Sequence, residues 1–258
     1  MPVDGMNEQP AVKVQLLGGL TIERADGTKV PLDGWRTRKS IDLLRVLSLA
    51  NGAPVRASVL TDRLWPAAPP TCAAGSLRTA ASEIRRVLGF NCVVRQLDSM
   101  MLVGAWVDVP VFRMLAHQVQ LASREDRCMV VVSLARAAEA IYRGDFHASD
   151  DDSEWARDER DQLVQTRAEV STEAATCALH LGLHREALDL ARTAVRLVPT
   201  SEQAHRALMR AWAGMGETAT ALQVFESYRT RLAEELGADP SVETRELHVR
   251  LLRGVETA

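Results

Sequence analysis

The chain has 258 residues, about twice the size of an average domain, so one large domain or two smaller ones are expected. Apolar residues make up 47% and charged residues 25%, which is typical of a globular protein whose core needs no disulfide support. The formal net charge of −3 is unevenly spread, with +3 in residues 1–108 and −6 in residues 109–258, and this weakly favours different partners for the two parts.

Neither the N-terminal segment nor the hydropathy of the chain indicates export or membrane insertion. The N-terminal MPVDGMNEQP is polar and acidic and lacks a basic segment followed by an apolar one. The longest aliphatic run, MVVVSLA, is far shorter than the roughly 20 residues that span a bilayer. The four cysteines have no paired spacing and are interpreted as buried thiols of a reducing cytoplasm: Cys72, Cys92, Cys128 and Cys177.

The first hundred residues read as strands, three helices and a hairpin. After a tail at residues 1–11, predicted to be disordered, apolar residues alternate from Val12, and Asp26-Gly27 is a hairpin turn. Helical spacing of Leu43, Leu47 and Ala50 predicts a first helix that stops at Asn51-Gly52. A short second helix holds Leu60 and Leu64. Thr71 is expected to cap the third helix, residues 73–88, and CVVRQLDSMMLV predicts strand, turn and strand.

From residue 108 onward the pattern is helical, with seven candidate helices separated by Gly, Pro and Asp/Ser signals. The segments LGLHREAL and MGETATAL match in frame, so that Gly182 corresponds to Gly216 and Ala187 to Ala221. The offset of 34 residues is the tetratricopeptide period, in which each repeat is a pair of antiparallel helices. Since one such pair cannot bury its apolar face alone, the helices are predicted to stack.

The third helix is the candidate functional element. A helical wheel places one apolar group on a single side, which is predicted to be buried: Leu77, Ala80, Ala81, Ile84 and Leu88. The opposite side is predicted to be exposed and carries Gly75, Arg78, Thr79, Ser82, Glu83, Arg85 and Arg86. Arginine and small hydroxyl residues suit contacts with phosphates and base edges, although any surface helix is charged on its outer side. The preceding helices and the following hairpin give the order of a winged helix-turn-helix.

Two long stretches resemble a known family. The segment WRTRKSIDLLRVLSLANG, continuing to SLRTAASEIRRVLG, is similar to the DNA-binding half of the Streptomyces antibiotic regulatory proteins (SARPs), whose winged helix is of the OmpR/PhoB type. The stretch from YRGDF to LAEELGADPSVETRELHVRLL resembles the bacterial transcriptional activator domain that follows it. The resemblance implies a mainly α fold, with a winged helix and small β-sheet at residues 12–107 and an all-α, tetratricopeptide-like domain at residues 108–258.

The resemblance and the residue types together assign roles at the expected interface. Arg78 is the first choice for a base-edge contact, and Thr79 and Ser82 are assigned to base edges or phosphates. Phosphate contacts are expected for Arg85 and Arg86, backbone contacts for Arg36, Arg38 and Lys39, and a minor-groove contact for Arg95 in the hairpin. Glu83 stands where the family often has a basic residue. It is interpreted as either accepting from a cytosine amino group or repelling phosphate.

The resulting prediction is a cytoplasmic, nucleoid-associated transcriptional activator that binds direct repeats in duplex DNA. It is expected to act as a homodimer that contacts RNA polymerase, without a membrane or a cofactor. The rival prediction is a protein-interaction module whose winged helix no longer binds DNA, with Glu83 as its sign. A ligand sensor with a small molecule in the repeat groove is a third alternative.

No catalytic set is expected, because the chain lacks a phosphate-binding glycine loop, a G-x-S-x-G elbow and an H-E-x-x-H motif. Cys177, His180 and His184 have a spacing that metal sites use. However, Gly182 interrupts the helix between the two histidines and no fourth ligand follows, so no metal site is predicted. The acidic HASDDDSE is interpreted as a helix-leading loop, with calcium binding as a distant alternative.

Overall fold

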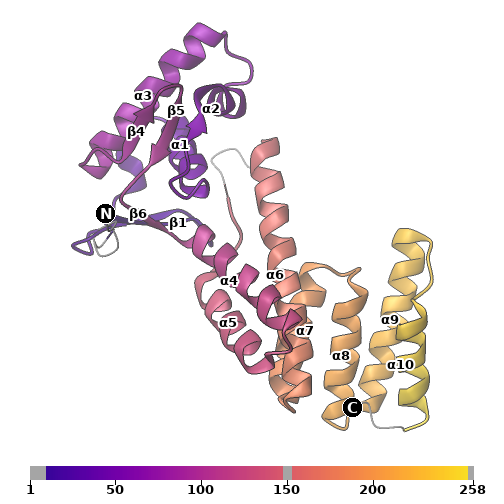
Figure 1. The fold of residues 1–258 in the computed structure, drawn as a ribbon. Coiled ribbons are helices and arrows are strands. Elements are labelled where there is room, and N and C mark those ends of the chain that lie inside the picture. The colour runs from indigo at the N-terminus through magenta and orange to yellow at the C-terminus, as the bar shows by residue number, and fades with distance from the viewer. Residues whose placement is uncertain (1–9, 148–152, 255–258) are drawn as a thin grey trace. The chain divides into compact units, whose positions relative to one another are not determined.

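The computed structural model describes residues 10–147 and 153–254, and the chain forms two compact units (Figure 1). The first unit comprises Met1–Phe112 and Ile141–Arg160, and the second comprises Arg113–Ala140 and Asp161–Ala258. Nearly all of the predicted N-terminal tail and most of the acidic loop lie outside the described residues. Within the described residues, no helix is both long and apolar enough to cross a membrane.

The first sheet has the strand order β2-β1-β6, built from β1 (Val12–Gln15), β2 (Thr21–Arg24) and β6 (Ala105–Val107). β1 and β2 pair antiparallel, and the predicted Asp26-Gly27 turn follows: Gly27 N–H donates to the Arg24 carbonyl at 2.9 Å. Asp26 Oδ1 accepts from Thr28 N–H at 2.8 Å. The parallel pairing of β1 with β6 was not predicted, because it joins strands about 90 residues apart.

The winged helix-turn-helix is present in the first unit. Its helices are α1 (Arg38–Leu49), α2 (Ala57–Leu64) and α3 (Pro70–Leu88), after a short 3-10 turn η1 (Leu32–Gly34). The second sheet has the order β3-β5-β4, with β3 (Val55–Arg56), β4 (Val93–Gln96) and β5 (Ser99–Leu102). We call the β4–β5 hairpin the wing; it lies beside the helices in Figure 1.

Both ends of α3 follow from local chemistry. Thr71 is not the N-cap that the sequence suggested: the helix begins at Pro70, a residue whose fixed φ and missing N–H suit the first helical position. At the other end Gly89 adopts φ 84° and donates its N–H to the Arg85 carbonyl at 2.9 Å. A left-handed glycine of this kind terminates a helix without a Cβ clash.

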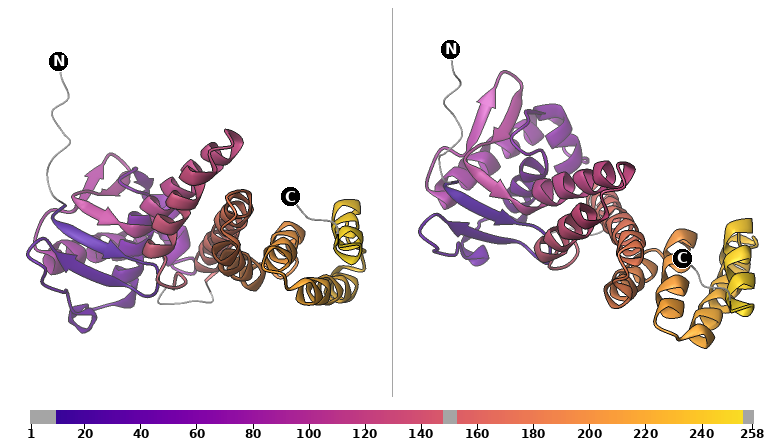
Figure 2. Two further views of the ribbon diagram at one scale, coloured as in Figure 1. Left: turned by 90° about the horizontal axis from the view of Figure 1, so that it is seen from below. Right: turned by 60° about the horizontal axis from the view of Figure 1, so that its bottom comes forward.

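The C-terminal half contains all seven predicted helices. They are α4 (Asp108–Arg124), α5 (Cys128–Ile141), α6 (Glu154–His180), α7 (His184–Leu197), α8 (Glu202–Gly214), α9 (Thr218–Leu236) and α10 (Val242–Leu252). Within the second unit α8 packs against α7 and α9, and α10 packs on α8 and α9 (Figure 2). The seven predictions succeed because these helices are long and bounded by caps and glycines.

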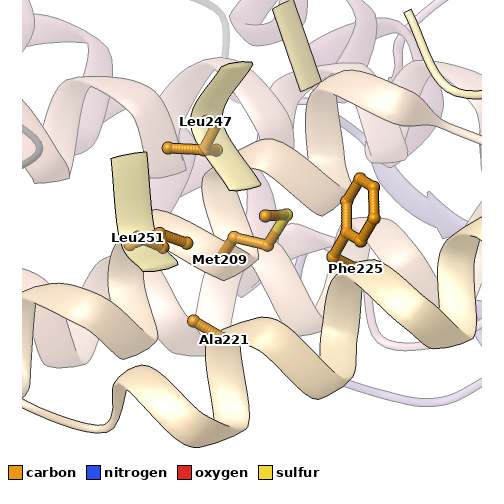
Figure 3. Close-up of a cluster of buried hydrophobic side chains, with 5 residues drawn as sticks. All are labelled: Met209, Ala221, Phe225, Leu247 and Leu251. Carbon is orange, nitrogen blue, oxygen red and sulfur yellow. The ribbon is translucent and has the colours of Figure 1, made fainter. Parts of the chain in front are cut away.

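The internal repeat is confirmed at its turns and contacts. Gly182 and Gly216 both adopt positive φ, at 72° and 84°, between α6 and α7 and between α8 and α9. Ala187 and Ala221, the matched alanines, are fully buried, so the helices approach closely there. The last three helices share an apolar cluster (Figure 3) that consists of Met209, Ala221, Phe225, Leu247 and Leu251.

The chain returns to the first sheet between α5 and α6. Phe146 is fully buried and forms a β-bridge with Leu17, just beyond the end of β1. Its ring meets Trp155 edge-on, with ring centroids 6.0 Å apart. Gly18 and Gly144 face each other so closely that a Cβ on Gly144 would lie 2.9 Å from the Gly18 Cα. Residues 141–160 therefore complete the first unit although they follow two helices of the C-terminal half.

A buried carboxylate holds the end of β1 at the start of α4. Asp108 is 1% exposed and accepts hydrogen bonds from the amides of Leu16, at 2.9 Å, and of Leu17, at 3.0 Å. It also accepts from the amide of Val109 in its own helix. Burial nevertheless raises the pKa of the Asp108 carboxyl, because the desolvation of the charge outweighs the stabilisation by these donors.

Candidate nucleic-acid interface

The apolar side of α3 is buried as predicted. Its five apolar residues are each no more than 4% exposed: Leu77, Ala80, Ala81, Ile84 and Leu88. They pack against α1 and α2, which both contact α3. Burial of this stripe fixes which side of the helix remains at the surface.

The front of the outer side of α3 exposes Arg78 together with two hydroxyl residues. Arg78, Thr79 and Ser82 are all exposed. Thr79 Oγ1 donates to the Gly75 carbonyl at 3.1 Å, within the helix. Arg78 has no hydrogen bond or ion pair with any described residue, so its five donors are open to an incoming group. Ala74 and Gly75 have short side chains, so little bulk covers the N-terminal part of the helix surface.

The prediction that Glu83 is exposed on the outer side of α3 is wrong. The helical wheel placed it among the exposed residues, but it is only 5% exposed. Its carboxylate accepts from the Arg36 amide and, at 2.7 Å, from Ser40 Oγ. Glu83 therefore binds the start of α1 and does not project from the surface. Sequence reasoning missed this because the donors lie more than 40 residues away, and the local pattern gives no sign of them.

Arg85 lies on the flank of α3 that faces the wing. It is half-buried, and Nε donates to the Val93 carbonyl at 2.8 Å while Nη2 donates to the same oxygen. The guanidinium thus connects α3 to β4. In the structure Arg85 is a link between the helix and the wing, and its predicted phosphate contact stays a prediction.

Arg86 is half exposed and leans toward the segment before α1. Its Nη2 donates to the Gly34 carbonyl at 3.2 Å and lies 3.6 Å from Glu83 Oε1. At 3.6 Å, and with the Arg86 side chain half exposed to solvent, this ion pair is weak. The predicted phosphate role of Arg86 requires only that the guanidinium exchange these partners for a phosphate.

The basic residues at the start of α1 follow a buried indole in the chain. Arg36 and Arg38 are exposed and Lys39 is half-buried. Trp35 is a core residue, with 8% of its surface exposed. The backbone is ordered here by Thr37, whose hydroxyl accepts from the Ser40 amide as the N-cap of α1.

The wing brings Arg95 close to the exposed side of α3. Arg95 is exposed, and its Nε donates to the Leu97 carbonyl in the tight turn at 3.0 Å. Arg78 and Arg95 both line a hollow of about 320 Å³, together with Trp65, Leu77 and Met100. Trp65 is therefore only half-buried, at the wall of this hollow. The structure thus gathers two of the predicted arginines, one from α3 and one from the wing.

The suspected metal spacing does not form a site. α6 ends at His180 and α7 begins at His184, whose ring packs against Gly214. Within residues 10–147 and 153–254, no cluster of three or more His, Cys, Asp or Glu is arranged to hold a metal ion. The cysteines also differ from the expectation of uniformly buried thiols, because Cys72 is exposed and Cys128 is only partly buried.

Comparison with known sequences gives relatives along nearly the whole chain. The regulatory protein AfsR of Streptomyces griseus is 29% identical over 237 residues, which cover 88% of this chain and 24% of that protein. The regulatory protein DnrI of Streptomyces peucetius is 26% identical over 260 residues, which cover 94% of this chain and 92% of DnrI. The chain spans about a quarter of the length of the AfsR proteins.

The fold has a counterpart among solved structures, and the sequence matches a family. Mycobacterium tuberculosis EmbR, solved in complex with a low affinity phosphopeptide, superposes with a TM-score of 0.80 at 24% identity, over 95% of this chain and 65% of that one. This likeness confirms the predicted fold class. Residues 107–252 match the family model of the bacterial transcriptional activator domain. Because that match spans more than half of the sequence, the chain belongs to the bacterial transcriptional activator domain family, and its resemblance to the SARP regulators is confirmed.

Proposed function

We propose that this chain is a sequence-specific DNA-binding regulator of transcription that acts as an activator. Residues 12–107 form its DNA-binding domain and residues 108–258 its activator domain. The outer side of α3 enters the major groove of a promoter, and the helical repeats mediate dimerisation or contact with a partner such as RNA polymerase. The protein is not an enzyme, needs no cofactor, and acts in the cytoplasm at the nucleoid.

One observation carries this proposal: Arg78 is exposed, has no partner among the described residues, and lies between small residues on a helix whose other side is anchored in the core. An arginine fork that has no internal partner loses no protein contact when it binds the O6 and N7 atoms of a guanine. Thr79 and Ser82 flank Arg78 on the same exposed side and offer hydroxyl groups to base edges or phosphates.

The other predicted contacts differ in how free they are to reach DNA. Arg36, Arg38 and Lys39 follow the buried indole at the start of α1 and are assigned to phosphates. Arg86 joins them by exchanging its weak contacts for a phosphate. Arg95 is assigned to the minor groove next to the site that α3 occupies. Arg85 acts indirectly, because it holds the wing against α3, and we propose this positioning role ahead of a direct contact.

The buried Glu83 removes the main argument for a winged helix that no longer binds DNA. That alternative relied on a carboxylate displayed toward the phosphates. The carboxylate instead accepts hydrogen bonds inside the first unit, so the exposed side of α3 carries hydroxyls and a guanidinium without that negative charge. The interaction-module alternative retains support only from the small net charge of the N-terminal part.

Binding to DNA sequences selected from a random pool tests the proposal directly. The full chain is expected to retard a selected duplex and to discriminate against scrambled DNA at moderate salt. Arg78→Ala is expected to lower specific affinity by about 5- to 150-fold, because losing a bidentate contact to guanine costs about 1–3 kcal/mol. The matched control is Arg196→Ala, an exposed arginine of α7, which is expected to leave binding unchanged.

Salt dependence separates base contacts from phosphate contacts. Arg86→Ala is expected to weaken binding to all sequences about equally and to reduce the slope of log K against log salt by about 1. A duplex with two half-sites in direct repeat is expected to bind two protomers more tightly than one half-site. A native chain that shows no sequence preference, or an Arg78→Ala variant with native affinity, would contradict the proposal.

A further inference from the structure

Two thiols from distant parts of the chain touch in the second unit. Cys128 is the first residue of α5, and Cys177 lies one turn before the end of α6. Their sulfur atoms are 2.9 Å apart, and both cysteines are free. A disulfide bond is about 2.05 Å long, so the two sulfurs need to approach by less than about 1 Å to bond.

The two thiols differ in accessibility. Cys128 is partly exposed at the N-terminus of α5, and its Sγ lies 3.8 Å from Nδ1 of the exposed His180. Cys177 is buried at 5% exposure. Burial, followed by the neighbouring Cys128 and by the charges of Glu173 and Asp126, raises the pKa of the Cys177 thiol to about 12. Cys128 is therefore the thiol that meets an oxidant first, and Cys177 is shielded from it.

We propose that Cys128 and Cys177 are a site of reversible oxidation, at which a peroxide converts the contacting thiols into a disulfide that joins α5 to α6. In a reducing cytoplasm the pair rests as two thiols, which is the state of the structure. This inference does not depend on DNA binding, because both cysteines and their surroundings belong to the second unit.

The chemistry takes two balanced steps with hydrogen peroxide as the oxidant. Cys128 gives its proton to His180 or water, and the thiolate attacks a peroxide oxygen: an S–O bond forms, the O–O bond breaks, and hydroxide leaves as water with that proton. The sulfur of Cys177 then attacks the Cys128 sulfenic acid, forming the S–S bond, and the hydroxyl group leaves as water with the Cys177 proton. Two thiols lose two electrons in total, and one peroxide becomes two waters. A dithiol reductant reverses the result by thiol–disulfide exchange.

The displacement of the hydroxyl group is favoured by the same contact that disfavours ionisation of Cys177 in the resting pair. Once Cys128 is a neutral sulfenic acid, its charge no longer opposes ionisation of Cys177, whereas burial, the largest cause of the raised pKa of Cys177, remains. The second step then has its nucleophile already nearby, since the two sulfurs lie 2.9 Å apart in the resting pair.

Peptide mapping of the full-length chain after peroxide treatment tests the proposal. The expected result is the loss of two free thiols and a Cys128–Cys177 linked peptide lighter by two hydrogens, which dithiothreitol converts back to the two thiol peptides. The exposed Cys72 and the buried Cys92 are internal comparators that lack a contacting partner thiol among the described residues. The linked peptide is expected at peroxide doses that leave Cys92 reduced.

Serine variants extend the test without depending on a single fold-sensitive change. Cys177→Ser is expected to accumulate a sulfenic acid at Cys128, detected by dimedone labelling, whereas Cys72→Ser is expected to form the disulfide at the native rate. Oxidation is also expected to raise the thermal midpoint of the native chain, and reduction to restore it. The proposal is overturned if the native chain forms no Cys128–Cys177 peptide while Cys72 is oxidised, or if Cys128→Ser and native chains consume peroxide equally.

Discussion

Glu83 sets the geometry between two helices with a single side chain. Its carboxylate, in the C-terminal half of α3, accepts hydrogen bonds from the Arg36 amide and the Ser40 hydroxyl at the start of α1. Ser40 is also the residue whose amide is capped by Thr37. The N-terminus of α1 and the side of α3 are thus linked through one buried group, which orients the exposed side of α3.

Replacement of Glu83 is therefore expected to affect stability before specificity. Glu83→Ala leaves a buried hydroxyl and an amide without their acceptor, which is expected to lower the free energy of unfolding by about 1–3 kcal/mol. Urea unfolding of the full chain measures this change, with the exposed Asp62→Ala of α2 as a surface control. A Glu83→Ala variant with native stability and a changed DNA preference would show that the carboxylate faces the nucleic acid after all.

Asp108 gives the first unit an unusual dependence on pH. Because burial raises its pKa in the folded protein, the native state holds this proton over a pH range in which the unfolded chain has lost it. Its contribution to stability is therefore greatest below the ordinary Asp value of 3.8 and declines as pH rises through the folded pKa. Asp26 has the opposite sign, because hydrogen bonds from Thr28 lower its pKa.

The difference in unfolding free energy between the native chain and Asp108→Asn is expected to shrink as pH rises from about 4 through the folded pKa, and then to level off. Urea titrations over a pH series measure it. For Asp26→Asn the difference is expected to grow with rising pH through the lower range. A native-minus-Asp108→Asn difference that increases with pH would contradict the interpretation.

At the scale of elements, α7 and α8 approach closely where a glycine meets a histidine ring. A Cβ on Gly214, the last residue of α8, would collide with the ring of His184, the first residue of α7. The His184 Nδ1 is shielded from solvent and has no hydrogen-bond partner among the described residues. The contact between Gly214 and the His184 ring is therefore made by packing alone, and it leaves no room for an added methyl group.

Two glycine substitutions are expected to have opposite effects for this reason. Gly214→Ala is expected to destabilise the second unit by about 1–3 kcal/mol through overpacking. Gly75→Ala, in the second turn of α3 with open space around the added Cβ, is expected to stabilise the first unit by about 0.5–1 kcal/mol through helix propensity. Differential scanning calorimetry of both variants checks the pair, and a stabilising Gly214→Ala would mean that the ring yields.

Local pattern predicts these elements well and their long-range contacts poorly. The seven C-terminal helices, the Asp26-Gly27 turn and the buried stripe of α3 follow from periodicity and turn chemistry within a short window. The contacts of Glu83 with α1 and of Cys128 with Cys177 join residues more than 40 positions apart, which local periodicity does not relate. Arg85 and Val93 are only eight residues apart, but no sequence motif links them. The sequence thus predicted the exposed arginine and hydroxyl residues of α3. It did not predict that tertiary contacts bury the Glu83 carboxylate and engage Arg85.

At the scale of the whole molecule, sequence order and structural unit do not coincide. The first unit includes residues 141–160, which follow α4 and α5 in the sequence. Within this segment Phe146 is fully buried and forms the β-bridge with Leu17, just beyond β1. The sheet at the N-terminus is therefore completed by a side chain that the chain supplies about 130 residues later. Each unit still has its own core, as Figure 3 shows for the last helices of the second.

Phe146→Ala and Phe225→Ala are expected to weaken different units of the same chain. Truncating a buried phenylalanine costs about 3–5 kcal/mol. Hydrogen exchange followed by mass spectrometry is expected to show lost protection in β1 and β6 for Phe146→Ala, with α8 and α9 unchanged, and the reverse for Phe225→Ala. Equal loss in both units for either variant would show that the whole chain unfolds as one cooperative body.

The β-bridge between Phe146 and Leu17 has a consequence for modular exchange within the family. The family match begins at residue 107, yet Asp108 and Phe146 both serve the sheet that precedes it. A recombinant crossover at residue 107 would combine β1 from one parent with the residues at positions 108 and 146 from another parent. Functional hybrids of these regulators should therefore take the 141–160 segment and the N-terminal strands from the same parent. Otherwise they should carry compensating substitutions at the contacts between the two.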